Sequence, residues 1–406
     1  MKYSIPYGRQ NIDSTDIQAV IETLQSDFMT QGPKVEAFEK VVSDYHGCKY
    51  AVAFSNGTAA LHGSYYASGI KEEESFITSP ITFAATANAG LYVGAKPKFV
   101  DINMENYNID LKLLEKSLSE DVKVILPVSF AGYPVDLKSI REIVGRNRVI
   151  IHDAAHAIGA LYDGRNIIDY ADMTILSFHP VKHIACGEGG MVLTNDKNYY
   201  EKLKLFRSHG ITKDIDKLSK YDGPWYYEMQ ELGFNYRLTD LQSALGISQM
   251  AKLNQSIYKR NKIANYYMER LKDNEWLQLP KPISKLTWLN EEAYHDLRNS
   301  PQMLHSYHLF PVIVRNFNIR KHFYDYLRSK GIYSQVHYIP VHTLPYYQDK
   351  FGYREGDYPC AEKFYQCELS LPMYPSITEE ELDYVIATIN SYPIEKEISE
   401  RNFICS

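Results

Sequence analysis

The chain has 406 residues, 45% hydrophobic and 23% charged, which is typical of a folded globular protein of two or three domains. Its 44 Lys and Arg against 50 Asp and Glu give a formal net charge of −6, so no basic surplus is available for a nucleic-acid backbone. Apolar stretches are shorter than the ~20 residues that span a bilayer, and five cysteines without a CxxC pair favour reduced thiols. We therefore expect a cytoplasmic protein that binds neither nucleic acid nor membrane.

The first half of the chain alternates short apolar runs with helical patterns. Residues 13–43 are helical apart from a Gly-Pro turn at 30–33. Strands are expected at 51–54, 75–79, 98–100, 122–128, 149–151 and 173–177, with helices at 58–68, 81–93 and 137–144. Short apolar strands between helices indicate an α/β fold with a mostly parallel central sheet covered on both faces.

The second half begins with a long helical pattern at 238–270. A smaller α/β unit follows over 276–393, with strands at 308–314 and 333–337 and a helix at 321–330. Since no Ser/Gly-rich linker intervenes, a large domain of residues 1–255 and a small C-terminal domain of residues 256–406 should pack with a cleft between them.

The segment 55–61 places a small-residue turn between an expected strand and helix. Gly57 and Thr58 would open that helix, where free N–H groups and the helix dipole suit a phosphate. An ordinary capping turn, with Asn56 or Thr58 as the cap, is the other interpretation.

Asp153 follows an expected strand, so its carboxylate should point into the crevice where open α/β sheets bind ligands. His152 and His156 lie four residues apart, as metal ligands on a helix do, and so do His179 and His183. No third ligand at suitable spacing accompanies either pair, and Pro180 argues against a regular helix, so no metal site is expected.

Lys182 lies just beyond another buried strand and before a Gly-rich turn at 187–190. Burial would lower the pKa of its amine and make it nucleophilic, whereas a surface loop would leave it an ordinary lysine. Further along, Asn235 and Arg237 precede a helix that Thr239 or Asp240 would cap, and capping leaves those two residues unexplained.

Together these pieces fit one chemistry, transamination by pyridoxal 5′-phosphate (PLP). Lys182 would bind the cofactor covalently and then carry the proton, and Asp153 would pair with the ring nitrogen so that the ring accepts electrons. Gly57, Thr58 and Ser177 would hold the phosphate, and Phe83 would cover one face of the ring.

The chain resembles the DegT/DnrJ-type nucleotide-sugar aminotransferases, which are fold-type I PLP enzymes. Five motifs carry most of the likeness: 30–33, 82–88, 153–156, 177–190 and 235–244. The resemblance implies that Lys182 is the catalytic lysine, that Asp153 contacts the ring nitrogen, and that His156 replaces a common Gln near the cofactor's phenolic oxygen. It also implies a homodimer in which Asn235 reaches the neighbouring subunit's cofactor.

Loop similarities imply a UDP-linked keto sugar as amino acceptor, with L-glutamate as donor. The implied substrate-contacting residues are Tyr7, Asp27, Phe28, Met29, Thr30, Arg237, Gln335, Val336, His337, Tyr338 and His342. Arg207 and His209 are further candidates for binding a nucleotide diphosphate.

Five alternatives compete with this interpretation. The nearest is an aminotransferase for another nucleotide-linked keto-deoxysugar, giving a 3- or 4-amino sugar. A related branch dehydrates sugars with a histidine in place of the lysine, and Lys182 argues against it.

The other three belong to different classes of protein. The intact set of Lys182, Asp153 and Ser177 argues against a non-catalytic cofactor-binding regulator. A hydrolytic metal site on the histidine pairs lacks a third ligand, and a tyrosine-lined carbohydrate-binding module would leave the surroundings of Lys182 without a purpose.

Overall fold

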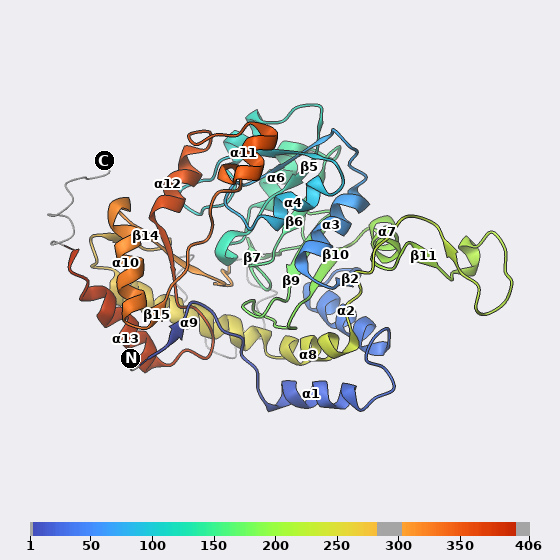
Figure 1. Ribbon diagram of the computed structural model, residues 1–406, viewed down its shortest axis with the longest axis horizontal. Helices are drawn as coiled ribbons and strands as arrows, with labels where there is room; N and C mark the ends of the chain where they lie inside the picture. Colours follow the sequence, from blue (N-terminus) through green and yellow to red (C-terminus); the bar gives the residue numbers. More distant parts are fainter. Residues whose placement is uncertain (1–2, 282–302, 395–406) are drawn as a thin grey trace.

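The computed structural model describes residues 3–281 and 303–394, and a seven-stranded sheet forms its centre (Figure 1). β10 runs antiparallel to both of its neighbours, and the other neighbouring strands pair in parallel, which confirms the expected mostly parallel sheet. In spatial order the strands are β2 (Tyr50–Phe54), β10 (Gly190–Thr194), β9 (Met173–Ser177), β6 (Val149–Asp153), β5 (Val122–Leu126), β3 (Ser75–Thr78) and β4 (Lys96–Phe99).

Helices cover both faces because the strands are apolar on both sides. Val52 and Phe54 of β2 pack with one group of helices, whereas the alternating residues Ala51 and Ala53 pack with another. The first face is covered by α3 (Gly57–Ser68), α4 (Ala85–Leu91) and α7 (Lys197–Arg207). The opposite face is covered by α2 (Pro33–His46), α5 (Leu111–Lys116), α6 (Leu137–Val144) and α8 (Asp240–Met250).

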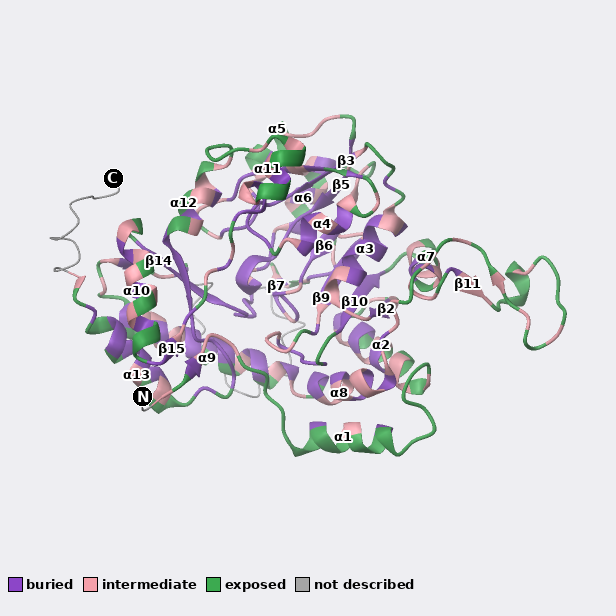
Figure 2. Ribbon diagram, viewed as in Figure 1, coloured by how far each residue is buried: buried purple, intermediate pink, exposed green. Residues whose placement is uncertain are grey.

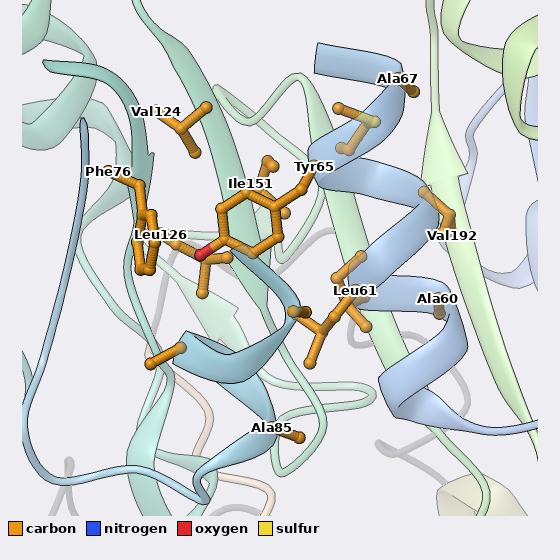
Figure 3. Packing of buried hydrophobic residues seen from close by; sticks show 14 of the residues in the cluster. Ala60, Leu61, Tyr65, Ala67, Phe76, Ala85, Val124, Leu126, Ile151 and Val192 are labelled. Carbon is orange, nitrogen blue, oxygen red and sulfur yellow. The ribbon is translucent and has the colours of Figure 1, made fainter. Parts of the chain in front are cut away.

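Tyr65 of α3 anchors this packing on the first face (Figure 3). Its buried ring meets the Phe76 ring edge-on at 5.0 Å between centroids, and its hydroxyl donates to the Thr86 carbonyl at 3.1 Å. This contact ties α3 to α4, and both helices carry residues that face the cavity described below.

The C-terminal part has its own core around an antiparallel sheet of β13 (Leu277–Gln278), β14 (Phe310–Val314) and β16 (Glu368–Leu371). Around it lie α9 (Leu253–Leu271), α10 (Phe317–Ser329), α12 (Pro359–Cys367) and α13 (Glu379–Asn390), whereas α11 (Pro345–Phe351) packs on the large sheet through Tyr347 and Phe351. Ile5, in β1 (Ile5–Pro6), joins this core by pairing with β15 (Ile332–Tyr333). The expected boundary between residues 255 and 256 falls within α9 and stays a prediction.

Three expected elements differ clearly from the structure. The helix expected at 81–93 is shorter, because residues 81–84 form a bend and a turn and α4 spans only Ala85–Leu91. The single helix expected at 238–270 is two helices, because the chain tightens where the Lys252 N–H bonds the Gln249 carbonyl three residues back and the Lys252 side chain pairs with Asp13 and Asp16. The strand expected at 333–337 ends at Tyr333, because the next residues bond β16 irregularly and partly through the Glu368 side chain.

A long arm leaves the body between α7 and α8 (Figures 1 and 2). It contains the short hairpin of β11 (Ile211–Thr212) and β12 (Glu228–Met229). Large apolar side chains stay exposed along it, with Trp225 72% and Leu232 75% accessible. The N-terminal helix α1 (Ser14–Leu24) is also mostly exposed on its outer side (Figure 2).

A smaller hairpin, β7 (Leu161–Tyr162) with β8 (Arg165–Asn166), follows β6. Within residues 3–281 and 303–394, no helix has the length and apolar character that crossing a membrane requires.

Candidate functional site

A cavity of about 880 Å³ opens where the carboxyl ends of β6 and β9 meet the N-terminus of α3. This is the position at which open α/β sheets bind ligands. Its wall contains many of the residues singled out in the sequence: Tyr7, Gly57, Thr58, Phe83, Asp153, His156, Ser177, Lys182, Gln335, Val336, His337 and Tyr338.

One end of the cavity suits a phosphate. Asn56 caps α3 by accepting a hydrogen bond from the Ala59 N–H at 2.8 Å, which confirms the capping interpretation, and the phosphate-binding interpretation stays a prediction. The amides of Gly57 and Thr58, in the first turn of α3, have no partner in a preceding turn and remain for an anion. A Cβ on Gly57 would lie 3.4 Å from the Ser177 hydroxyl oxygen, so glycine keeps that hydroxyl close to the amides.

Gly190, the first residue of β10, supports the same turn from behind. A Cβ at this position would lie 2.4 Å from the Asn56 carbonyl oxygen, closer than real Cβ contacts. We expect Gly190→Ala to displace the turn and to raise the dissociation constant of a phosphate-bearing ligand at least about tenfold. Equilibrium titration with PLP would measure this, with circular dichroism as the control for folding; an unchanged affinity in a folded variant would contradict the assignment.

Asp153 ends β6 and is buried in the floor of the cavity. Its carboxylate accepts hydrogen bonds from the Thr86 hydroxyl at 2.8 Å and the Ala155 N–H at 3.1 Å. Burial raises its pKa, and these hydrogen bonds together with the Lys182 charge act in the opposite direction. A buried carboxylate held in this way is suited to pair with a protonated ring nitrogen.

Lys182 lies half-buried in the cavity wall, in the turn after β9. Desolvation lowers the pKa of its amine to about 7, although the nearby Asp153 carboxylate favours the charged form. Near neutral pH a large share of the amine is therefore unprotonated, which is the form that attacks a carbonyl carbon.

This lowered pKa predicts a pH dependence. Below pH 7 the amine is protonated and unreactive, so limiting acetic anhydride should modify Lys182 in the cofactor-free chain with a half-maximal rate near pH 7. A lysine peptide added as the internal standard should titrate near the ordinary pKa of about 10.4. Mass spectrometry would quantify the acetylation of each lysine at each pH. A Lys182 profile that coincides with that of the standard would contradict the prediction.

His156 is buried beside Lys182, and its Nε2 lies 3.1 Å from the Tyr338 hydroxyl. Its Nδ1 is buried without a hydrogen-bond partner among the described residues. Burial is the largest cause that lowers the pKa of His156 well below its ordinary value, and the Lys182 charge adds to it. An unpaired imidazole nitrogen in a cavity wall calls for a partner on a ligand.

Phe83 completes the cofactor side of the cavity. Its ring is 62% exposed yet lines the cavity, 6.1 Å from the Tyr338 ring centroid, so one face stays open for stacking. The phosphate turn, the buried carboxylate, the nucleophilic amine, the unpaired imidazole nitrogen and the open aromatic ring together fit PLP.

The opposite wall comes from two segments far apart in the sequence. Tyr7 follows β1, and the segment 335–338 follows β15. Buried Glu368 holds this segment by accepting from the His337 N–H at 2.8 Å and from the Ser370 hydroxyl at 2.6 Å. Ser370 in turn contacts His337 Nδ1 at 2.9 Å, which fixes the segment's shape.

Seven residues expected at the site are absent from the wall of the cavity within one chain: Asp27, Phe28, Met29, Thr30, Asn235, Arg237 and His342. Phe28, Met29 and Asn235 are exposed. His342 is buried and its Nε2 pairs with the Glu362 carboxylate at 2.9 Å. Arg207 is likewise engaged, in an ion pair with Glu39.

The structure also brings in residues that the motif analysis passed over. The Thr82 and Thr86 hydroxyls lie 2.7 Å apart and lead to Asp153, and His308 Nε2 lies 3.4 Å from Lys182 Nζ. Thr82 and Thr86 lie inside a motif, so their positions were available, whereas nothing local marks His308. Within the described residues, no group of three or more His, Cys, Asp or Glu is arranged to hold a metal ion.

Comparison with known proteins agrees with this geometry. Residues 10–390 match the model of the DegT/DnrJ/EryC1/StrS aminotransferase family. The Campylobacter jejuni (strain 81-176) UDP-4-amino-4,6-dideoxy-N-acetyl-beta-L-altrosamine transaminase is 37% identical over 391 residues, covering 95% of this chain and 97% of that protein.

Solved structures agree as well. Helicobacter pylori PseC, an aminotransferase involved in the biosynthesis of pseudoaminic acid, superposes with a TM-score of 0.85 at 32% identity, covering 98% of this chain and 100% of that one. Spr1654 from Streptococcus pneumoniae in its PLP form gives a TM-score of 0.85 at 27% identity, covering 97% and 100%. The chain belongs to the DegT/DnrJ/EryC1/StrS family of PLP-dependent sugar aminotransferases.

Proposed function

We propose that this aminotransferase moves the amino group of L-glutamate to C4 of a UDP-4-keto-6-deoxy-N-acetylhexosamine in the cytoplasm. The product would be UDP-4-amino-4,6-dideoxy-N-acetyl-β-L-altrosamine, an intermediate for pseudaminic acid. The observation that carries the acceptor assignment is the wall formed by Tyr7 and residues 335–338, which faces the cofactor residues across the cavity. The likeness to the Campylobacter jejuni transaminase supports this choice of sugar.

When PLP is bound, its ring supplies an electron sink for the carbanion that forms at the carbon bearing the amino group. Asp153 keeps the ring nitrogen protonated, and the Thr86 hydroxyl keeps Asp153 in place. Lys182 would hold PLP covalently and, as a free amine, would take the proton from glutamate's α-carbon and return a proton to C4 of the sugar. In the cofactor-free chain the pKa of this amine is about 7, so its charged and neutral forms are both populated near neutral pH.

A second copy of the chain would complete the site. Lys182 is the only Lys or Arg among the described residues that line the cavity, yet a nucleotide diphosphate needs cations. Asn235 pairs with Ser208 where the arm joins the body, and Arg237 lies between that point and α8. Apolar side chains such as Trp225 and Leu232 are exposed on the arm, as expected of a surface that a partner covers. We infer a homodimer in which Asn235 and Arg237 act on the neighbouring subunit's cavity.

The experiment is a product analysis with ¹⁵N-labelled glutamate. The PLP-loaded protein is offered UDP-4-keto-6-deoxy-N-acetylhexosamine, and mass spectrometry and NMR should find ¹⁵N at C4 together with one equivalent of 2-oxoglutarate. GDP- and dTDP-linked 4-keto sugars and a 3-keto isomer are the matched acceptors. Preferred use of any of these would replace the proposed substrate while keeping the family chemistry.

A further inference from the structure

His308 is a buried histidine two residues before β14, between the large sheet and the C-terminal core. Its carbonyl accepts a hydrogen bond from Arg260 of α9 at 3.3 Å. The next residue, Leu309, donates its N–H to the Ala131 carbonyl at 3.2 Å. The backbone is thus held from two sides, which fixes the ring.

The His308 ring contacts the Lys182 amine. Its Nε2 lies 3.4 Å from Lys182 Nζ, although His308 is not among the residues that line the cavity. The ring packs against His156 with centroids 4.3 Å apart and lies 5.6 Å from the His183 ring. His308 therefore contacts the lysine outside the lining of the cavity.

The surroundings keep this imidazole neutral. Besides each other, the titratable and charged groups that interact with His308 or Lys182 are Asp153 on β6, Arg260 on α9, and the histidines 156, 183 and 337. Burial first, and then the positive charges among these groups, lower the pKa of His308 well below its ordinary value. A neutral imidazole has one nitrogen that donates and one that accepts.

The direction of the hydrogen bond follows from the lysine. A protonated amine has only donors, so His308 Nε2 accepts from it and His308 Nδ1 carries the ring proton. When the amine is neutral, one of its N–H groups can stay on Nε2. The lone pair of the Lys182 amine can then point toward the cavity rather than toward His308.

We propose that His308 is a positioning residue for Lys182: its Nε2 accepts an N–H of the lysine amine from behind, so that the lone pair or the transferable proton faces the cavity. This proposal rests on the proposed role of Lys182 as the proton carrier. It adds a group outside the cavity that prepares the lysine for each half of the reaction.

The test compares two replacements of His308 in the full chain. His308→Phe keeps a ring against His156 but removes the acceptor, whereas His308→Gln can restore an acceptor near the position of Nε2. His305→Phe is the matched control, because His305 is a buried histidine of the same segment that stacks on Tyr307. If His308→Phe fails to fold, His308→Asn replaces it, since the shorter amide does not reach Lys182.

Two readouts are measured. In the cofactor-free protein, the pH profile of Lys182 acetylation should move to lower pH in His308→Phe and return toward wild type in His308→Gln, because the acceptor stabilises the protonated amine. In the PLP-loaded enzyme, kcat of His308→Phe should fall about tenfold with the KM for glutamate changed less than about twofold. His305→Phe should leave both readouts unchanged.

An acetylation profile of His308→Phe that superposes on the wild type would overturn the proposal and leave His308 as packing. A folded His308→Gln that behaves like the phenylalanine variant would overturn it too. The acetylation readout does not depend on transamination. A shifted profile in a protein that aminates no sugar would therefore keep the His308–Lys182 contact and refute only the proposed reaction.

Discussion

Lys182→Ala should lower kcat/KM for transamination by about 10⁴-fold or more, because the substitution removes both the covalent link to PLP and the amine that carries the proton. The cavity wall retains the phosphate turn at Gly57 and the carboxylate of Asp153, so we expect the variant still to bind PLP without a covalent bond. The ultraviolet–visible spectrum gives the direct measurement. The wild type should show the absorption band of the lysine-bound cofactor, and this band should disappear when glutamate is added. The variant should not show the band before or after glutamate is added.

The control for this experiment is Lys202→Ala, an exposed lysine on α7 outside the cavity. It should keep the wild-type spectrum and rate. Absence of the band in a folded wild-type protein, or turnover by Lys182→Ala at more than about a hundredth of the wild-type rate, would refute the assignment of Lys182.

Asp153→Asn should lower kcat about 10³-fold, which corresponds to a rise of about 4 kcal/mol in the activation free energy. The amide keeps the shape of the side chain but cannot hold a positive charge on the ring nitrogen. Rate constants for the half-reaction with glutamate alone would measure the loss. Thr86→Val is the companion variant: it removes the hydroxyl that holds Asp153 and should cause a smaller loss of about tenfold.

Asp153→Asn should not lower the stability of the cofactor-free protein. Burial raises the pKa of Asp153 in the folded chain, so the stability linked to this group is present at low pH and is lost as pH rises through the folded pKa. Because asparagine does not ionise, Asp153→Asn should not lose this stability as pH rises. Its unfolding temperature at pH 8 should equal or exceed that of the wild type, with the advantage shrinking toward the ordinary carboxyl pKa of about 4. A clearly lower unfolding temperature at pH 8 would show that the carboxylate is structurally required.

The part of the site that follows strand ends could be predicted from the sequence. Asp153 ends β6, Ser177 ends β9 and Gly57 begins α3. Parallel strands bring their carboxyl ends to one edge of the sheet, so recognising the strands was enough to bring these residues together. β10 was missed because the glycines before Gly190 obscured a run of only five buried residues.

Contacts across long separations could not be predicted in this way. His308 meets Lys182 across 126 positions, and Thr86 meets Asp153 across 67. Such pairs depend on how helices pack on the sheet and on how the C-terminal core docks, which periodicity does not encode. The expected contact of Asn235 is with a neighbouring subunit, so it stays a prediction that the contacts within one chain do not test.

The short pairing of β1 with β15 has a consequence for the shape of the cavity. It carries Tyr7 to the cavity, and the Met373 N–H secures the Tyr7 carbonyl at 2.9 Å, so a residue of the N-terminal segment and residues 335–338 share one lining. Asp153, Ser177 and Lys182 line the same cavity from the ends of strands in the large sheet. A substitution that loosens the β1–β15 pairing should therefore widen the cavity without displacing Asp153 or Lys182.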